Sequence, residues 1–214
     1  MAKTDDLIDS LVGDLAPVRA DALGRRLLLA VSIGLGFSAL LLFGLRGFRP
    51  DIETALYLPE FWVKAAYPLL LALAGFAAML VVARPGGWPR SFAVIAIASY
   101  LLLVALGLAQ LHLAEASAYP NLIFGISYWI CPFIVIGTGM PFFIANIWFM
   151  KRTAPTDLRL AGFICGLTAG SGGAFVYSWG CIENGLAFIA IWYTLGILAM
   201  GLIGAASARR LLAW

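Results

Sequence analysis

The stretch FAVIAIASYLLLVALGLAQLHL, residues Phe92–Leu113, contains no Asp, Glu, Lys or Arg. A helix of about 20 apolar residues crosses the hydrocarbon core of a bilayer. Because that core holds no water, every backbone N–H and C=O inside it must be bonded within the chain. The stretch lacks the alternation of a barrel strand, and it therefore predicts a transmembrane helix.

Five further apolar stretches lie before and after this one. They leave the 214-residue chain 63% hydrophobic and only 12% charged, whereas soluble proteins carry about 25% charged residues. We expect an all-α, polytopic membrane protein with six transmembrane helices. One stretch is overlong and contains Pro132 and Pro141, which indicates a kinked helix or an interfacial turn before the helix enters the bilayer. The five stretches are Leu27–Leu45, Ala65–Ala83, Leu122–Met150, Leu158–Gly180 and Leu186–Ala206.

Basic residues gather on one side of these helices. Eleven of the fourteen fall in the N-terminal segment, the second and fourth loops and the C-terminal tail. By the positive-inside rule both termini are cytoplasmic. The net charge of +3 therefore reflects topology and gives no reason to expect direct nucleic-acid binding. We divide the chain into a cytoplasmic segment 1–26, a transmembrane domain 27–208 and a cytoplasmic tail 209–214. The eleven residues are Lys3, Arg19, Arg25, Arg26, Arg84, Arg90, Lys151, Arg152, Arg159, Arg209 and Arg210.

The N-terminal segment predicts a short amphipathic helix with an acidic polar face. Thr4 is a suitable N-cap, and Pro17 ends the pattern. Helices that lie on membranes are usually rich in Lys and Arg on the polar face, so this one is poorly suited to a bilayer surface. We expect it to bind a groove of a protein partner, or to fold back on the cytoplasmic ends of its own helices. Its apolar stripe is Leu7, Ile8, Leu11, Val12 and Leu15, and its acids are Asp5, Asp6, Asp9 and Asp14.

The three cysteines differ in their expected depth. Cys131 and Cys181 fall in the outer half of the bundle, whereas Cys165 lies 16 residues before Cys181, near the cytoplasmic face. Each thiol is interpreted either as a small apolar side chain or, for Cys131 and Cys181, as a functional pair that reacts with oxidants or soft metals. Cys131 is nine residues into its span, so a disulfide would require a loosely wound helix start. His112 and Glu183 are weaker candidates as further ligands of a transient soft-metal ion, and no other cofactor is expected.

Small and polar residues inside the spans predict helix packing. Gly162, Gly166 and Gly170 form a small-xxx-small pattern, which serves contacts within the monomer or between two copies. Asn146 is expected to bond to a neighbouring helix. Tyr193 is assigned to the aromatic belts at the membrane interfaces, together with Trp62, Trp88, Trp129, Trp179, Tyr119 and Tyr128.

Other function classes find less support. We expect no enzyme, because one histidine is the only candidate base and no CxxC pair is present. A transporter commonly has ionisable groups at mid-membrane, yet the spans contain no Asp, Glu, Lys or Arg there, and Lys64 and Arg159 lie at their boundaries. The alternative that stays open is a small membrane metal or solute transporter, because the Cys131-Pro132 step resembles the Cys-Pro element of metal-moving membrane proteins.

Several segments in a fixed order carry a family resemblance. The opening segment 4–18, six spans, the two outer cysteines and the run FIAIWYTLG at 188–196 together resemble the NrsF-type anti-sigma factors of proteobacteria. The resemblance covers essentially the whole chain. It implies a multi-pass protein of the bacterial inner membrane that holds an extracytoplasmic-function sigma factor inactive and releases it under heavy-metal or oxidative stress. It also implies that Cys131 and Cys181 are the sensor pair. The sigma-binding residues would be Asp5, Asp6, Leu7, Ile8, Leu11, Asp14, Leu15, Pro17 and Val18.

Overall fold

The computed structural model of the protein describes residues 4, 9, 13 and 22–213. In this part of the chain the regular structure is entirely helical, and six helices are long and apolar enough to cross a membrane. The predicted fold class is therefore confirmed. Five spans are α2 (Ala22–Leu45), α4 (Pro59–Val82), α5 (Arg90–Leu113), α7 (Cys131–Met150) and α8 (Leu158–Ser178). The sixth is continuous and consists of α9 (Leu186–Phe188), a π-helix (Ile189–Tyr193) and α10 (Thr194–Leu212).

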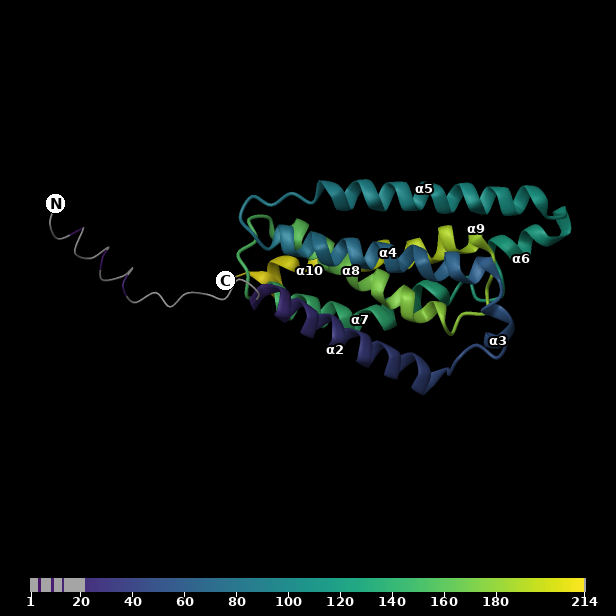
Figure 1. Ribbon diagram of the computed structural model, residues 1–214, viewed down its shortest axis with the longest axis horizontal. Coiled ribbons are helices and arrows are strands. Elements are labelled where there is room, and N and C mark those ends of the chain that lie inside the picture. The colour runs from purple at the N-terminus through teal and green to yellow at the C-terminus, as the bar shows by residue number, and fades with distance from the viewer. Residues whose placement is uncertain (1–3, 5–8, 10–12, 14–21, 214) are drawn as a thin grey trace.

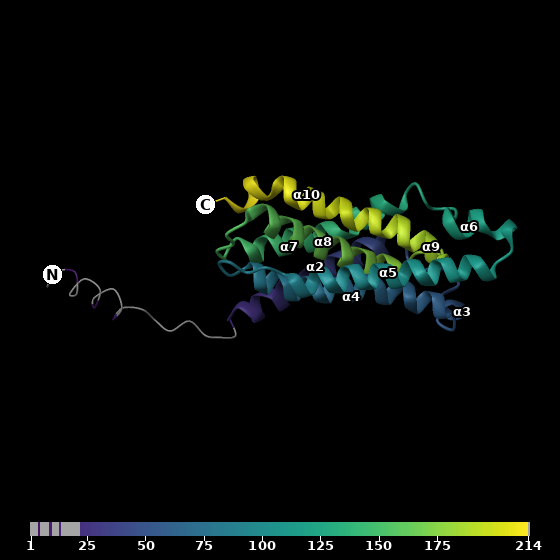
Figure 2. The same ribbon diagram turned by 90° about the horizontal axis from the view of Figure 1, so that it is seen from above.

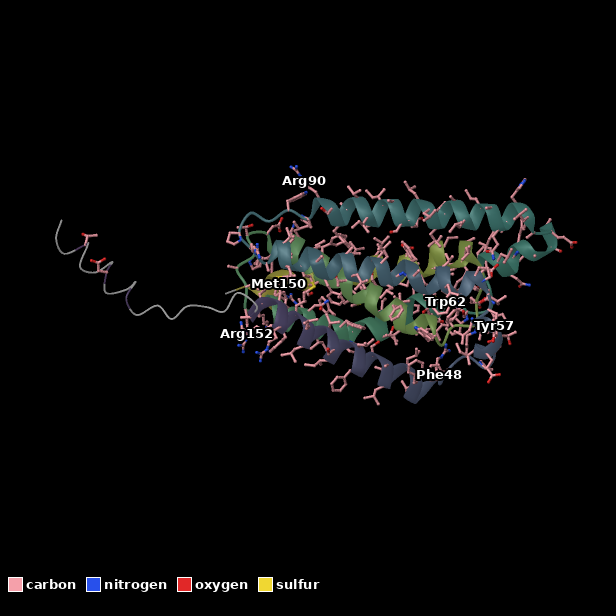
Figure 3. All side chains as sticks on the ribbon, viewed as in Figure 1. Phe48, Tyr57, Trp62, Arg90, Met150 and Arg152 are labelled. Atoms are coloured by element: carbon pink, nitrogen blue, oxygen red, sulfur yellow. The ribbon has the colours of Figure 1, made fainter. Side chains whose placement is uncertain are left out.

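The two ends of the bundle differ in their elements. The short helices α3 (Ile52–Ala55) and α6 (Tyr119–Ile123) lie at one end, and α2 begins and α10 ends at the other (Figures 1 and 2). We call the first the cysteine end, because it contains the segment Cys181–Gly185, and the second the basic end. Figure 3 shows Arg90 and Arg152 at the basic end. Both arginines lie at the end of the bundle away from α3, which agrees with the predicted gathering of basic residues on one side.

Local sequence explains where the helices begin. Pro59 and Pro132 stand in the first turns of α4 and α7, where a missing N–H leaves no helical bond unmade. Asp157 caps α8, and its carboxylate accepts bonds from the N–H groups of Arg159 and Leu160 at 2.9 and 3.0 Å. The residues at the helix starts therefore determine where α4, α7 and α8 begin.

Helix α8 forms the centre of the bundle. It packs against α10, α7 and α4, and most of its residues are buried. At Gly162 and Gly166 an added Cβ would overlap the backbone of α10 at Gly204 and Met200. The small-residue pattern therefore serves packing within the monomer, one of the two uses expected from the sequence. By contrast, α5 buries only three residues and runs along one edge of the bundle (Figure 1).

The outer surface of the bundle is apolar along its length. Leu28, Phe37, Leu40 and Leu101 are each at least 60% exposed, as lipid-facing side chains are. Trp62, near the cysteine end, is about half exposed and donates from Nε1 to the Leu56 carbonyl (Figure 3). These exposures fit a helix bundle surrounded by lipid.

The structure decides one alternative and corrects three expectations. Of the two forms expected for Leu122–Met150 it has the interfacial turn, since α6 ends at Ile123 and a turn precedes α7. Cys131 is consequently the first residue of α7 rather than nine residues inside a helix. Lys64 lies within α4 and is fully buried, and Tyr193 is buried rather than part of an aromatic belt.

Candidate functional site

The segment Cys181–Gly185, here called the connecting segment, joins α8 to α9 without regular structure. Extended backbone inside a helix bundle must find hydrogen-bond partners outside its own segment. Three side chains from distant parts of the chain supply them to four successive carbonyls. Lys64 Nζ donates to Cys181 O (2.8 Å) and Glu183 O (2.7 Å), Arg49 Nη2 to Ile182 O (3.4 Å), and Gln110 Nε2 to Asn184 O (3.3 Å).

Arg49 binds both an acid and the connecting segment. Its Nε and Nη2 donate to the two carboxylate oxygens of Asp51 at 2.8 and 2.7 Å, and its Nη1 donates to Asn184 Oδ1 at 3.1 Å. This bidentate bond holds the pKa of Asp51 below its ordinary value, because it favours the charged carboxylate. The Arg49 backbone N–H also donates to the carbonyl of Trp179, at 3.3 Å. The end of α2 is thereby attached to the end of α8.

Lys64 is the second cation at this end, and it has a different environment. Its side chain is fully buried, and within residues 22–213 no carboxylate forms a salt bridge with it. Besides the two carbonyls, the ammonium lies 5.7 Å from the centroid of the Phe61 ring. A buried ammonium inside a membrane helix is costly, and residues of this kind usually have a functional role.

Glu183 links the connecting segment to the turn that precedes α7. Its Oε1 accepts bonds from the N–H groups of Ile126 and Ser127, at 2.9 and 3.1 Å, and from the Ser127 hydroxyl at 3.0 Å. Ser127 O in turn accepts the N–H of Cys131 at 2.9 Å. The carboxylate fits closely because Gly125, at φ +55°, has no side chain where Glu183 packs.

The structure places Cys131 and Cys181 at the same end and buries both as free thiols. The N–H of Cys131 donates to Ser127 O at 2.9 Å, and Ser127 in turn donates to the carboxylate of Glu183. Cys165 is buried on α8 away from this group, and its carbonyl accepts a bond from Asn146 Nδ2 at 3.1 Å. The predicted bond from Asn146 to a neighbouring helix is confirmed, and the predicted separation of Cys165 from the other two cysteines agrees with the structure.

Two tyrosines complete the surroundings of the thiols. Tyr177 and Tyr193 are both buried and stack with ring centroids 5.5 Å apart, and the Tyr177 carbonyl accepts the N–H of Cys181 at 3.0 Å. Tyr193 belongs to the π-helix, a local form that is frequent at functional sites. Its buried hydroxyl has no hydrogen-bond partner among the described residues. The sequence did not predict this pair: Tyr193 resembles an interface anchor, and no pattern distinguishes Tyr177.

The cysteine end has an extensive hydrogen-bond network but no group of three possible metal ligands among the described residues. Across the described residues no three His, Cys, Asp or Glu side chains are placed to hold a metal ion together. His112 is exposed in the last turn of α5, and the carboxylate of Glu183 already accepts three bonds. The two thiols remain the residues for which soft-metal binding is a prediction.

The predicted partner-binding helix lies largely outside the described residues. This applies to all nine of its proposed contact residues, which are Asp5, Asp6, Leu7, Ile8, Leu11, Asp14, Leu15, Pro17 and Val18. The described chain resumes at Ala22, the first residue of α2, at the basic end. Whatever the N-terminal segment binds, it is joined covalently to a helix that reaches the cysteine end.

Comparison with known proteins identifies the family. The family model NrsF, described as "Negative regulator of sigma F", matches residues 11–214. The "Anti-sigma-F factor NrsF" of Caulobacter vibrioides is 38% identical over 213 residues, which are 99% of this chain and all of that protein. The "Probable anti-sigma-F factor NrsF" of Azospira oryzae is 35% identical over 215 residues, with the same coverage. No solved structure matches the chain. The chain therefore belongs to the NrsF family of negative regulators of sigma F.

Proposed function

We propose that this protein is an anti-sigma factor of the bacterial inner membrane. Its N-terminal segment binds an extracytoplasmic-function sigma factor in the cytoplasm, and chemistry at Cys131 and Cys181 on the outer side releases that partner. The observation that carries the proposal is the 38% identity to a named anti-sigma-F factor over 99% of this chain. That alignment includes both the acidic N-terminal segment and the cysteine end.

The acidic N-terminal segment supports a basic protein partner. Asp5, Asp6, Asp9 and Asp14 surround an apolar stripe of the kind that occupies a groove on another protein. A sigma factor binds DNA and carries basic surface, so complementary charge would steer the encounter while the apolar residues supply most of the affinity.

The attachment of α2 supports communication between the two ends. At its far end α2 continues into Arg49, which bonds to Trp179, Ile182 and Asn184. Along its length it packs on α7, where an added Cβ at Gly34 would overlap Phe142. A displacement of the connecting segment or of the start of α7 would therefore act on the helix that carries the N-terminal segment.

Thiol chemistry is the proposed input. The cysteine end contains two free thiols, the Lys64 ammonium, two stacked phenol rings and a backbone segment without regular structure. Oxidants and soft metals both react with such thiols. The Cys131-Pro132 step, on which the transporter alternative rests, stands at the start of α7 at one end of the bundle, and metal flux in reconstituted vesicles would distinguish that alternative.

A pull-down from the native bacterium tests the partner. Full-length protein and a version lacking residues 1–18 are compared, and a sigma factor is expected only with the full-length chain. Recovery of the sigma factor with both versions would exclude the N-terminal segment as the binding element. Absence from both would remove the anti-sigma proposal.

Reporter fusions test the orientation. Alkaline phosphatase fused after Glu115 is expected to be active, and the same enzyme fused after Thr156 or Ala213 inactive, because it folds only outside the cytoplasm. The reverse pattern would place the N-terminal segment on the wrong side of the membrane for a sigma factor.

A further inference from the structure

Glu183 contributes to two parts of the cysteine end through two different groups. Its backbone carbonyl accepts from Lys64 Nζ at 2.7 Å, and its carboxylate accepts the three bonds from Ile126 and Ser127. One residue therefore connects α4, the connecting segment and the turn before α7.

The bonds of Glu183 lie within a few residues of both thiols. Cys181 is two positions before it, and the same Lys64 Nζ also bonds to the Cys181 carbonyl at 2.8 Å. On the other side, Ser127 accepts the N–H of Cys131 at 2.9 Å. The path from one cysteine to the other thus passes through Glu183 and Ser127, with no intervening helix.

The Glu183 carboxylate does more than fill space between the helices, because burying it is costly. Its residue is only 8% exposed, and within residues 22–213 it makes no salt bridge. Burial of a charge without a paired cation is costly unless several hydrogen bonds compensate it. Three bonds to one oxygen compensate it here, and Gly125 leaves the space for that approach. From the sequence, Glu183 is a candidate metal ligand. In the structure, its carboxylate instead accepts hydrogen bonds from Ile126 and Ser127.

We propose that Glu183 is a positioning residue that brings the Cys131 and Cys181 thiols within reach of one another, with Lys64 fixing its backbone. This inference rests on the proposed function in one respect, namely that the two thiols act as a pair. The role requires the acceptor oxygen of Glu183 and does not require its charge.

Phenylarsine oxide measures the approach of the two thiols directly. It is neutral, and its trivalent arsenic forms two As–S bonds with a neighbouring pair while the arsenic-bound oxygen leaves as water with the two thiol protons. The assay uses purified full-length protein in lipid nanodiscs with Cys165→Ser, so that only Cys131 and Cys181 remain. Mass spectrometry then measures the bridged fraction against reagent concentration.

Matched variants separate position from charge. Glu183→Ala and Lys64→Met are expected to weaken bridging by about tenfold or more, as when a residue that orients a ligand group is lost. Glu183→Gln keeps an acceptor oxygen, Lys64→Arg keeps a donor, and both are expected to bridge within about twofold of the parent protein. Glu115→Ala, an exposed acid between α5 and α6, serves as the control and should bridge like the parent.

Two results would overturn the inference. Bridging of Glu183→Ala at the parent's concentration would show that the carboxyl group does not position the thiols. Equal loss in Glu183→Ala and Glu183→Gln would show that the charge matters and the acceptor does not.

If Glu183→Ala fails to fold, Ser127→Ala serves instead. It removes only one of the three bonds to Glu183, and it must then weaken bridging measurably. Because no sigma factor is present in the assay, a failure here leaves the anti-sigma proposal untouched, and a failed pull-down leaves the thiol geometry untouched.

Discussion

At the scale of single residues, the cysteine end depends on a few side chains whose partners lie far away in sequence. The expected association of Cys131 with Cys181 followed from the direction of their spans. The role of Lys64 did not, because its two carbonyl partners lie more than 110 residues later in an irregular segment. Hydropathy placed Lys64 at a boundary, since a single cation at a span edge is normally solvated. No local sequence pattern predicts that an ammonium group will bond to backbone carbonyls.

Gly125 provides a prediction at this scale. Replacement by Ala forces a side chain into a left-handed conformation at φ +55° and into the volume of the Glu183 carboxylate. We expect a loss of about 1–2 kcal/mol of stability, together with weaker bridging of the two thiols. Thermal unfolding in detergent micelles measures the first effect, and phenylarsine oxide the second.

The control is Gly137→Ala on α7, where an added Cβ meets nothing within 4 Å. It should unfold at the same temperature or slightly higher, because Ala exceeds Gly in helix propensity by about 1 kcal/mol. Equal destabilisation by the two variants would mean that the conformation of Gly125 is not the cause.

Asp51 provides a pH prediction. Its pKa is lowered in the folded protein by the bond from Arg49, so its stabilising contribution is complete above its ordinary pKa near 4. The contribution is lost as the pH falls through the folded value. Because the Asp51 side chain is 51% exposed, the effect is small. The unfolding temperature of the parent should fall more steeply than that of Asp51→Asn between about pH 4.5 and 3, and parallel curves would contradict the prediction.

At the scale of elements, the six spans and most of their boundaries could be predicted from the sequence. Helices α2 and α4 begin five and six residues before the predicted spans, α10 ends six residues after its predicted span, and the largest difference is at the start of α7. The residues from Leu122 onward are apolar enough to continue a span, and the chain leaves the helix because Glu183 accepts the N–H groups of Ile126 and Ser127. That acceptor comes from a segment more than 50 residues away, so no window of local hydropathy contains it. The π-helix at Ile189–Tyr193 is hidden for a similar reason, because its sequence is that of an ordinary apolar helix.

The contact between α8 and α10 provides a prediction at this scale. Gly166→Ala places a Cβ against the backbone of Met200 and should separate the two helices, at a cost of about 1–3 kcal/mol. Gly36→Ala on α2 adds the same atom where nothing lies within 4 Å, and its unfolding temperature should stay near that of the parent. A similar fall for both variants would show that Gly166 is not required by the close approach of the helices.

At the scale of the whole molecule, the two proposed functions, thiol chemistry and sigma-factor binding, belong to opposite ends of one bundle. The thiols lie at the cysteine end, and the N-terminal segment precedes α2 at the basic end. A ligand can change the affinity at the far end only by binding more tightly to one arrangement of the bundle than to another. The free-energy requirement is modest, since a tenfold weakening of the sigma factor needs about 1.4 kcal/mol of differential binding. Two arsenic–sulfur bonds, which the thiols can make only when they are close together, can supply a difference of that size.

The corresponding prediction concerns release of the partner. Full-length protein in nanodiscs, loaded with the sigma factor, should lose at least part of it when phenylarsine oxide is added, as measured by size-exclusion chromatography. The double variant Cys131→Ser with Cys181→Ser should retain the sigma factor under the same conditions. This variant also controls for reaction of the arsenical with cysteines of the partner.

Further variants test the path from the thiols. Cys165→Ser should behave like the parent, because Cys165 lies on α8 away from the connecting segment. Glu183→Gln should release normally and Glu183→Ala poorly, since release depends on bridging. If the double serine variant releases the sigma factor as readily as the parent, the input does not enter through these thiols.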